Sequence, residues 1–165
     1  MNDAQKISPT QQTIGLVASS LIWFAAAGLG SLVTTPQIPN WYADLAKPAW
    51  TPPDWIFGPV WTLLYVMMAV AAWLVWRLDG FAGAKVPLAL FAIQLVLNSI
   101  WSVLFFGLQN PGAAAVEIVL LWAAILATLV TFWKRSKWAG GLLVPYLAWV
   151  SFAAVLNVAI WRMDV

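Results

Sequence analysis

Five long apolar runs, whose interiors hold a single charged side chain, decide which fold this chain can adopt. A helix of about 20 apolar residues crosses the hydrocarbon of a bilayer, and every run reaches that length. The predicted spans are residues 14–34, 57–77, 86–107, 112–134 and 138–161. The sequence therefore predicts an all-α membrane protein. Its five transmembrane helices form one bundle, and residues 1–165 form a single integral membrane domain.

The composition excludes several classes of function. Of the 165 residues, 63% are hydrophobic and 8% are charged, and the mean hydropathy is +0.85, whereas a soluble domain carries about a quarter charged residues. The 8 basic and 6 acidic side chains give too weak a positive field for nucleic-acid binding. Cysteine and histidine are both absent, which excludes disulfides, thiol nucleophiles, zinc sites, histidine bases and histidine-ligated haem. We predict no metal site.

The basic residues predict the orientation. With five spans, Lys6, Arg77, Lys85, Lys134, Arg135 and Lys137 share a side with the N-terminus, and only Lys47 and Arg162 fall on the other side. In a bacterial cell membrane, which we expect, the positive-inside rule places the N-terminus in the cytoplasm. The rule would not apply in an outer membrane, which is the alternative location. The length of span 14–34 and the lack of a small-residue cleavage site after it favour a retained helix over a signal peptide.

The connection between the first two spans, residues 35–56, is long and rich in proline and tryptophan. Prolines at positions 36, 39, 48, 52 and 53 prevent a long helix and stiffen the backbone. We expect a structured loop that acts as a lid. The alternative for Trp41, Trp50 and Trp55 is an aromatic belt at the headgroup level, and for each residue taken singly we favour the belt.

Three spans carry polar and aromatic stripes at helical spacing. They are Trp61 and Tyr65 in the second span, Gln94, Asn98, Trp101 and Ser102 in the third, and Pro145, Trp149, Ala153, Leu156 and Asn157 in the fifth. An amide within the membrane needs a partner or a cavity. Helix packing alone explains one such stripe, but three stripes with large aromatic residues beside amides favour a pocket for a small ligand.

Glu117 lies inside the fourth span. A carboxylate within a membrane span is a functional candidate by default. The alternative is that Glu117 reaches the interface or stays protonated, because it lies near the start of its helix. We favour this alternative over a proton or ion role.

Four segments carry a resemblance to a known family. WYADLAKPAWTPP, WIFGPVWTLLY, QLVLNSIWSVLFFG and WAGGLLVPYLAWVSFAAVLN resemble the tryptophan-rich sensory protein family, also called the translocator protein or peripheral-type benzodiazepine receptor family. The resemblance covers most of the chain, from the first loop to the C-terminus. It implies a five-helix bundle, usually a homodimer, whose cavity is covered by the first loop.

The resemblance also implies ligands and site residues. The family's ligands include porphyrins, sterols in animal members, and synthetic benzodiazepines. By motif position, the ligand-binding residues here would be Tyr42, Phe57, Trp61, Tyr65, Asn98, Trp101, Trp149, Ala153 and Leu156. Trp61 and Trp149 also match the two tryptophans linked to light-dependent porphyrin breakdown in bacterial relatives. They would be the catalytic residues of such a reaction.

One departure from the family concerns the end of the fifth span. Animal members carry a sterol-recognition pattern there with a central tyrosine, but Val158 occupies that position in LNVAIWR. We therefore expect a tetrapyrrole in preference to a sterol, because its flat face stacks on indoles. Its propionates would meet Lys47 or Arg162. Without histidine or cysteine, a metal-free porphyrin is the more natural ligand, and no cofactor is required.

Three functions stay open. A receptor or sensor would bind porphyrin and regulate a tetrapyrrole or stress response, which requires only a pocket and a movable lid, and this is our main prediction. A photo-oxidative enzyme would degrade the bound porphyrin through Trp61 and Trp149. A transporter of tetrapyrroles or sterols would need alternating access, and the sequence shows neither an inverted repeat nor paired charges within the membrane.

Overall fold

A computed structural model describes residues 32–163 together with positions 10, 13, 15, 17 and 28. Most of the predicted first span, 14–34, lies outside the described residues. The structure therefore does not test the count of five helices.

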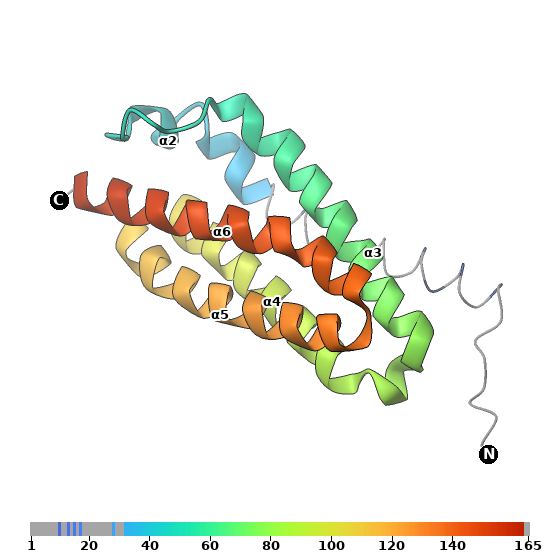
Figure 1. Ribbon diagram of the computed structural model, residues 1–165. Helices are drawn as coiled ribbons and strands as arrows, with labels where there is room; N and C mark the ends of the chain where they lie inside the picture. Colours follow the sequence, from blue (N-terminus) through green and yellow to red (C-terminus); the bar gives the residue numbers. More distant parts are fainter. Residues whose placement is uncertain are drawn as a thin grey trace, which may run out of the picture.

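Four long helices make up most of the described chain (Figure 1). They are α3 (Phe57–Gly83), α4 (Lys85–Ser102), α5 (Pro111–Arg135) and α6 (Lys137–Met163). Four helices in the described part are long and apolar enough to cross a membrane. The protein is therefore an integral, multi-pass membrane protein.

Short elements precede α3 and follow α4. The segment before α3 contains the 3-10 helix η1 (Thr35–Gln37), the single-turn helix α2 (Trp41–Asp44) and the 3-10 helix η2 (Asp54–Ile56). The π-helical turn η3 (Val103–Gly107) directly extends α4. The prolines expected to exclude a long helix from residues 35–56 leave only these short turns.

Local chemistry explains where the long helices begin and end. The Asn110 side chain accepts a hydrogen bond of 2.9 Å from the backbone N–H of Ala113, and Pro111 occupies the first turn of α5, as is common at helix starts. The regular part of α3 ends at Gly80, whose φ of 62° and ψ of −174° are not helical. The predicted end at residue 77 was therefore slightly early. Arg77 stacks over the Trp73 ring at 4.5 Å, so its charge is accommodated on the helix.

The end of the third span differs from the prediction. The spacing predicts a regular helix through residue 107, but the backbone widens at Val103, whose carbonyl accepts from the N–H of Leu108 over 2.7 Å. Gln109 then takes a φ of 50° and turns the chain toward α5. Such π turns occur frequently at functional sites, and this one holds the buried side chains of Phe105 and Phe106.

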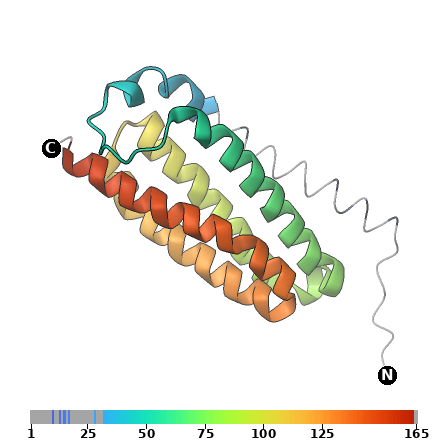
Figure 2. The ribbon, with the colours of Figure 1, turned by 45° about the horizontal axis from the view of Figure 1, so that its top comes forward.

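Consecutive long helices run antiparallel to each other (Figures 1 and 2). The bundle therefore has two ends, which are formed by different segments of the chain. At the first end, α2 and its connections lie over the starts of α3 and α5 and the ends of η3 and α6. We call this the cavity end. At the other end, called the packed end, α3 meets α4 and α5 meets α6. Lys85, Lys134 and Lys137 belong to the packed end, and Arg162 belongs to the cavity end.

Close contacts fill the packed end. Phe91 and Phe132 stack with ring centroids 5.6 Å apart, and both are buried. At Gly140 a Cβ atom would come within 2.7 Å of the Trp133 Cα atom, so only glycine lets α6 start this close to α5. Around them, Ala71, Ala72, Val75, Ala139 and Leu143 are at most 2% exposed.

Candidate functional site

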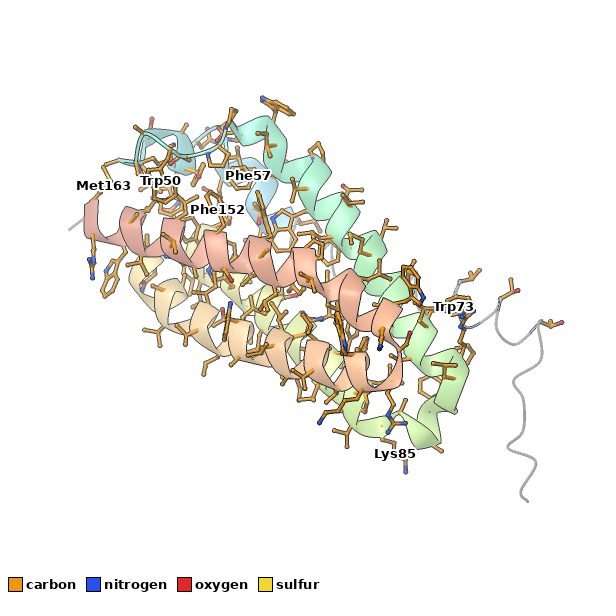
Figure 3. All side chains as sticks on the ribbon, viewed as in Figure 1. Trp50, Phe57, Trp73, Lys85, Phe152 and Met163 are labelled. Atoms are coloured by element: carbon orange, nitrogen blue, oxygen red, sulfur yellow. The ribbon has the colours of Figure 1, made fainter. Side chains whose placement is uncertain are left out.

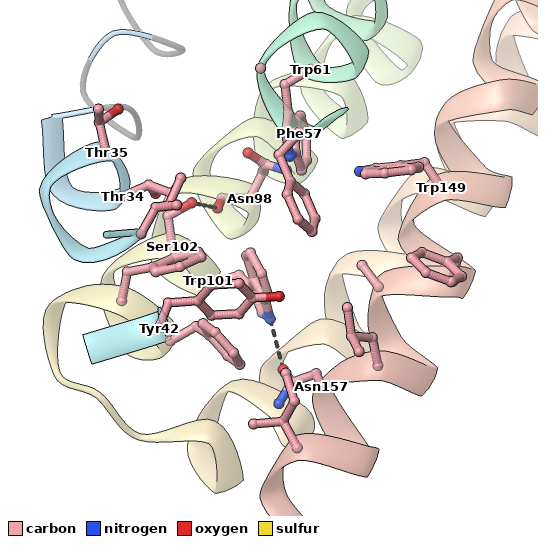
Figure 4. Close-up of a pocket in the computed structure, with 18 of the residues that line it drawn as sticks. Thr34, Thr35, Tyr42, Phe57, Trp61, Asn98, Trp101, Ser102, Trp149 and Asn157 are labelled. Atoms are coloured by element: carbon pink, nitrogen blue, oxygen red, sulfur yellow. Dashed lines mark hydrogen bonds between the residues drawn. The ribbon is translucent and has the colours of Figure 1, made fainter. Parts of the chain in front are cut away.

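A cavity of about 290 Å³ lies at the cavity end, between the segment before α3 and helices α3, α4 and α6 (Figure 4). Its lining includes all nine residues predicted as ligand contacts: Tyr42, Phe57, Trp61, Tyr65, Asn98, Trp101, Trp149, Ala153 and Leu156. Four separate segments of the chain thus bring these side chains together. Their role as ligand contacts stays a prediction.

The lining also includes residues that were not predicted as ligand contacts. They are Thr34, Thr35, Ile38, Gly58, Thr62, Ser102, Phe105, Phe106, Phe152, Asn157 and Ile160. Ser102 and Asn157 belonged to the predicted stripes, and Thr62 is one residue from Trp61. Phe105 and Phe106 lie in the π turn and continue the stripe of Asn98, Trp101 and Ser102 at the same spacing, which was the signal that the prediction did not use. A signal for Phe152 was its place three residues after Trp149 on the same helix.

The chain before α3 closes one side of the cavity. Tyr42 of α2 is 3% exposed and packs its ring on Phe57, Phe105 and Phe106 at centroid distances of 5.8 to 6.3 Å. Trp50 contacts Phe152 of α6 at 5.8 Å (Figure 3). We call residues 35–56 the lid, because these contacts hold them against the bundle.

Three tryptophans of the lid occupy different environments. Trp41 packs edge-on against Phe105 at 5.6 Å, Trp50 is 49% exposed beside Phe152, and Trp55 is 73% exposed. Trp41 and Trp50 therefore help to fasten the lid, while the exposed indole of Trp55 is typical of an interfacial residue.

Lys47 stabilises the lid from within. Its ammonium donates to the backbone carbonyls of Tyr42 and Ala43 and lies 4.4 Å from the centre of the Tyr42 ring. A cation at the C-terminal end of a helical turn satisfies carbonyls that have no helical partner. Lys47 is not part of the cavity lining, so its expected contact with a ligand propionate would require the lid to rearrange.

The Tyr42 hydroxyl is buried and has no hydrogen-bond partner among the described residues. Burial, with a smaller contribution from the nearby Asp54 carboxylate, raises its pKa to about 12. The hydroxyl belongs to a residue of the cavity lining (Figure 4). The hydroxyl is therefore protonated at neutral pH, and a ligand that reached it would meet a donor without a partner among the described residues.

Aromatic rings form the walls. Phe57 meets Trp149 at 5.9 Å, Trp149 meets Phe152 at 5.6 Å, and Trp61 meets Tyr65 at 5.7 Å. On α4 and η3, Trp101 stacks on Phe105 at 5.2 Å with an interplanar angle of 20°. Rings at these distances leave flat, apolar surfaces on opposite sides of the cavity, which suit a planar conjugated ligand.

Two of the predicted polar residues hold helices together. The Trp101 indole N–H donates to the Asn157 side-chain oxygen over 3.0 Å, and the Asn157 amide nitrogen donates to the Pro111 carbonyl over 2.8 Å. These bonds join α4, α6 and α5. The sequence left helix packing and pocket formation as alternatives for the stripes. Both apply to Trp101 and Asn157, which line the cavity and also join helices.

Glu117 of α5 is 7% exposed, and neither carboxyl oxygen has a hydrogen-bond partner among the described residues. The side chain thus faces the bundle interior, which contradicts the first part of the favoured alternative, that it reaches the interface. The second part, that the carboxyl group stays protonated, stays a prediction. Within the described part of the chain, no three acidic residues cluster in a way that could hold a metal ion.

Comparison with known proteins gives concordant matches. The sequence model of the TspO/MBR family matches residues 18–162. The chain is 45% identical over 149 residues to the tryptophan-rich protein TspO of Archaeoglobus fulgidus, covering 90% of this chain and 96% of the relative. It is 47% identical over 125 residues to the human translocator protein, covering 74% of each chain. The tryptophan-rich sensory protein of Cereibacter sphaeroides is 38% identical over 140 residues, with 85% of each covered.

Proposed function

Because this chain belongs to the TspO/MBR family, we propose that it is a membrane receptor that binds flat hydrophobic ligands of the porphyrin class in its aromatic cavity. The observation that carries the proposal is the convergence of nine predicted contact residues, from four segments, around one cavity. Apolar walls with a few convergent polar groups are the usual features of a small-ligand site.

The size of the cavity bears on how such a ligand enters. A cavity of about 150 Å³ holds one benzene molecule, so 290 Å³ suits a ligand of a few fused rings. A tetrapyrrole is larger, and its binding requires the lid to move outward. The contacts that would break join Tyr42 to Phe57 and Trp50 to Phe152.

Movement of the lid supplies a signal. Ligand binding that displaces the lid changes the exposed surface of residues 35–56 without any chemical step, and a partner that recognises one lid position reads the ligand state. The name of the Cereibacter relative, tryptophan-rich sensory protein, is in line with this role. We therefore assign this protein a sensory function, with the lid as its output.

A dark titration with protoporphyrin IX tests the binding step. Tryptophan quenching and the Soret band are followed for the wild type, for Ala153→Phe, which fills the cavity, and for Val155→Phe. Val155 is 61% exposed on the same helix and does not line the cavity, so its variant is the matched control. We expect saturable binding by the wild type and the control, and at least a tenfold loss in Ala153→Phe. Equal affinities in all three would mean that porphyrin adsorbs to the exterior, and would overturn the proposal.

A second candidate function is photo-oxidation of the bound porphyrin. The Trp61 ring lies 5.7 Å from Tyr65 and 6.2 Å from Tyr146, so two phenols are close enough to reduce an indole radical. Light-dependent and oxygen-dependent loss of the Soret band in the wild type, absent in Trp61→Phe, would support this activity. A band that is equally stable in light and darkness would exclude it.

A further inference from the structure

A chain of hydrogen bonds leads from the cavity into the packed core. The Tyr65 hydroxyl donates to the Asn98 side-chain oxygen over 3.0 Å, and the Asn98 amide nitrogen donates to the Tyr146 hydroxyl over 3.2 Å. Tyr146 in turn donates to the Gln94 oxygen over 2.9 Å, and the Gln94 nitrogen approaches the Met68 sulfur at 3.9 Å. Only Tyr65 and Asn98 of these five line the cavity.

Met68 sets the direction of the chain. A thioether sulfur has no hydrogen to give and can only accept, so the Gln94 amide pairs both of its ends when its nitrogen faces Met68 and its oxygen faces Tyr146. Tyr146 must then donate to Gln94 and accept from Asn98. The direction of each hydrogen bond fixes the direction of the next one. In the last bond Tyr65 therefore donates to Asn98, away from the cavity. All five side chains therefore agree on one arrangement.

The same orientation recurs at the neighbouring hydroxyls of this wall. Thr62 donates its hydrogen to the Gly58 carbonyl over 2.9 Å, and Ser102 donates to the Asn98 carbonyl over 3.3 Å. With Tyr65, three hydroxyls that line the cavity on α3 and α4 have their hydrogens turned into the protein. Toward the ligand these groups present only lone pairs, so we call them the acceptor wall.

Tyr42 carries a hydroxyl of a different kind. Its ring packs on Phe57 of α3 and on Phe105 and Phe106 of η3, and the hydroxyl is buried with no partner among the described residues. A ligand that turns an N–H or O–H group toward the acceptor wall is paired there, whereas a ligand that turns an acceptor toward it leaves buried polar groups unpaired. An unpaired buried group costs about 1–3 kcal/mol.

We propose that Tyr146 and Gln94 are positioning residues that select ligands carrying an N–H or O–H group toward the acceptor wall. They are 0% and 1% exposed and act through Asn98 and Tyr65. The inference rests on the proposed function, since it concerns ligand choice at the same cavity. The ligand class it names is a flat aromatic molecule with a ring N–H or a phenolic O–H.

Carbazole and dibenzofuran form a matched pair of probes, because they share one three-ring outline and differ in an N–H against an ether oxygen. Their binding is measured by calorimetry on protein in nanodiscs, with empty nanodiscs subtracted. We expect the wild type to bind carbazole about 3–10-fold more tightly, which is the effect of one net hydrogen bond. Tyr65→Phe should abolish this preference.

Two core variants test the positioning role. Tyr146→Phe removes the acceptor of the Asn98 amide, and Gln94→Leu frees the Tyr146 hydrogen to donate to the Asn98 oxygen. In both variants the Asn98 amide can turn over and release the Tyr65 hydrogen into the cavity. We expect the carbazole preference to fall to about unity in both, and to persist in Ile93→Leu. Ile93 is 50% exposed on α4 and serves as the control.

The outcomes separate the two proposals. Equal binding of both probes by the wild type, or saturable binding of neither, overturns this inference, and the protoporphyrin IX titration then decides separately whether the proposed function stands. An unchanged preference in Tyr146→Phe and Gln94→Leu overturns the positioning role. Tyr65→Phe leaves the buried part of the chain intact, so it tests the acceptor wall independently of whether the core variants fold. If Tyr146→Phe and Gln94→Leu weaken the binding of both probes equally, so that the ratio of their affinities is unchanged, the two residues have a purely structural role and the positioning role is overturned.

Discussion

The two ends of this bundle are built from similar residue types but use them differently. At the packed end, Phe91 and Phe132 lie nearly parallel at 5.6 Å, and alanine and glycine let the helices approach closely. At the cavity end, the rings of Phe57, Trp149 and Phe152 stand apart from those of α4 and enclose about 290 Å³. The lid lies over this end alone (Figure 2).

The difference shows how one bundle combines stability with a binding site. Within the described part of the chain, every buried side-chain polar atom without a partner belongs to Tyr42 or Glu117, which lie on the lid and near the start of α5. Both positions belong to the cavity end. Stability is therefore concentrated where the helices pack, whereas one of the two residues with unpaired polar atoms, Tyr42, belongs to the cavity lining, as expected for a functional region.

The largest contrast should appear when one phenylalanine is removed from each end. Phe132 is fully buried, so Phe132→Ala should lower the free energy of unfolding by about 3–5 kcal/mol. Phe152 already borders empty space and is half-buried, so Phe152→Ala should cost roughly 1–2 kcal/mol. Unfolding in mixed micelles with increasing dodecyl sulfate measures both. Equal losses would show that the two ends contribute alike to stability.

Adding one methyl group is the next sharpest test, because two adjacent glycines of α6 differ in their surroundings. A Cβ at Gly140 would lie 2.7 Å from the Trp133 backbone, whereas a Cβ at Gly141 would have no atom within 4 Å. Gly140→Ala should therefore destabilise by about 1–3 kcal/mol through overpacking.

Gly141→Ala is the control for this test and has the opposite expected sign. It should stabilise by about 0.5–1 kcal/mol, because alanine favours the helix. The same dodecyl sulfate titration compares the two variants. Stabilisation by both would mean that the close approach of α5 and α6 is not a constraint.

The sequence predicts the long helices and the stripes that face the cavity more completely than the lid and the π turn. Four described helices lie within a few residues of the predicted spans because apolar length and helix caps are local properties. The site stripes on α3, α4 and α6 also follow from local spacing. Phe105 and Phe106 continue the α4 stripe at the same spacing, but the prediction ended the stripe at Ser102, and the π turn that holds them was not predicted. The position of Lys47 over Tyr42 depends on the fold of the lid, which no periodicity describes.

Replacing Glu117, near the start of α5, should change the free energy of unfolding by a smaller amount. Its buried carboxyl group has no partner among the described residues, so replacing it with an apolar side chain of similar size removes a desolvation cost. Glu117→Leu should raise the free energy of unfolding by about 1 kcal/mol. Thermal unfolding in detergent, with Leu120→Ala on the exposed side of α5 as a control near zero, measures the change. Destabilisation would mean that the carboxyl group makes a contact beyond the described residues, and the two ends would then differ less.

The smallest effect concerns the lid itself. Burial, with a further contribution from Asp54, raises the pKa of Tyr42 from 10.0 to about 12. Since the folded-state pKa is the higher one, the stabilisation linked to the neutral hydroxyl is complete below pH 10 and is lost as the pH rises through 12. The tyrosinate absorbance of the wild type minus that of Tyr42→Phe should therefore appear late in an alkaline titration. The stability advantage of the wild type over Tyr42→Phe should shrink across the same interval. A difference spectrum that develops around pH 10 would show that water reaches the hydroxyl, so that the lid does not close the cavity end, and the contrast between the two ends would then lie in the helices alone.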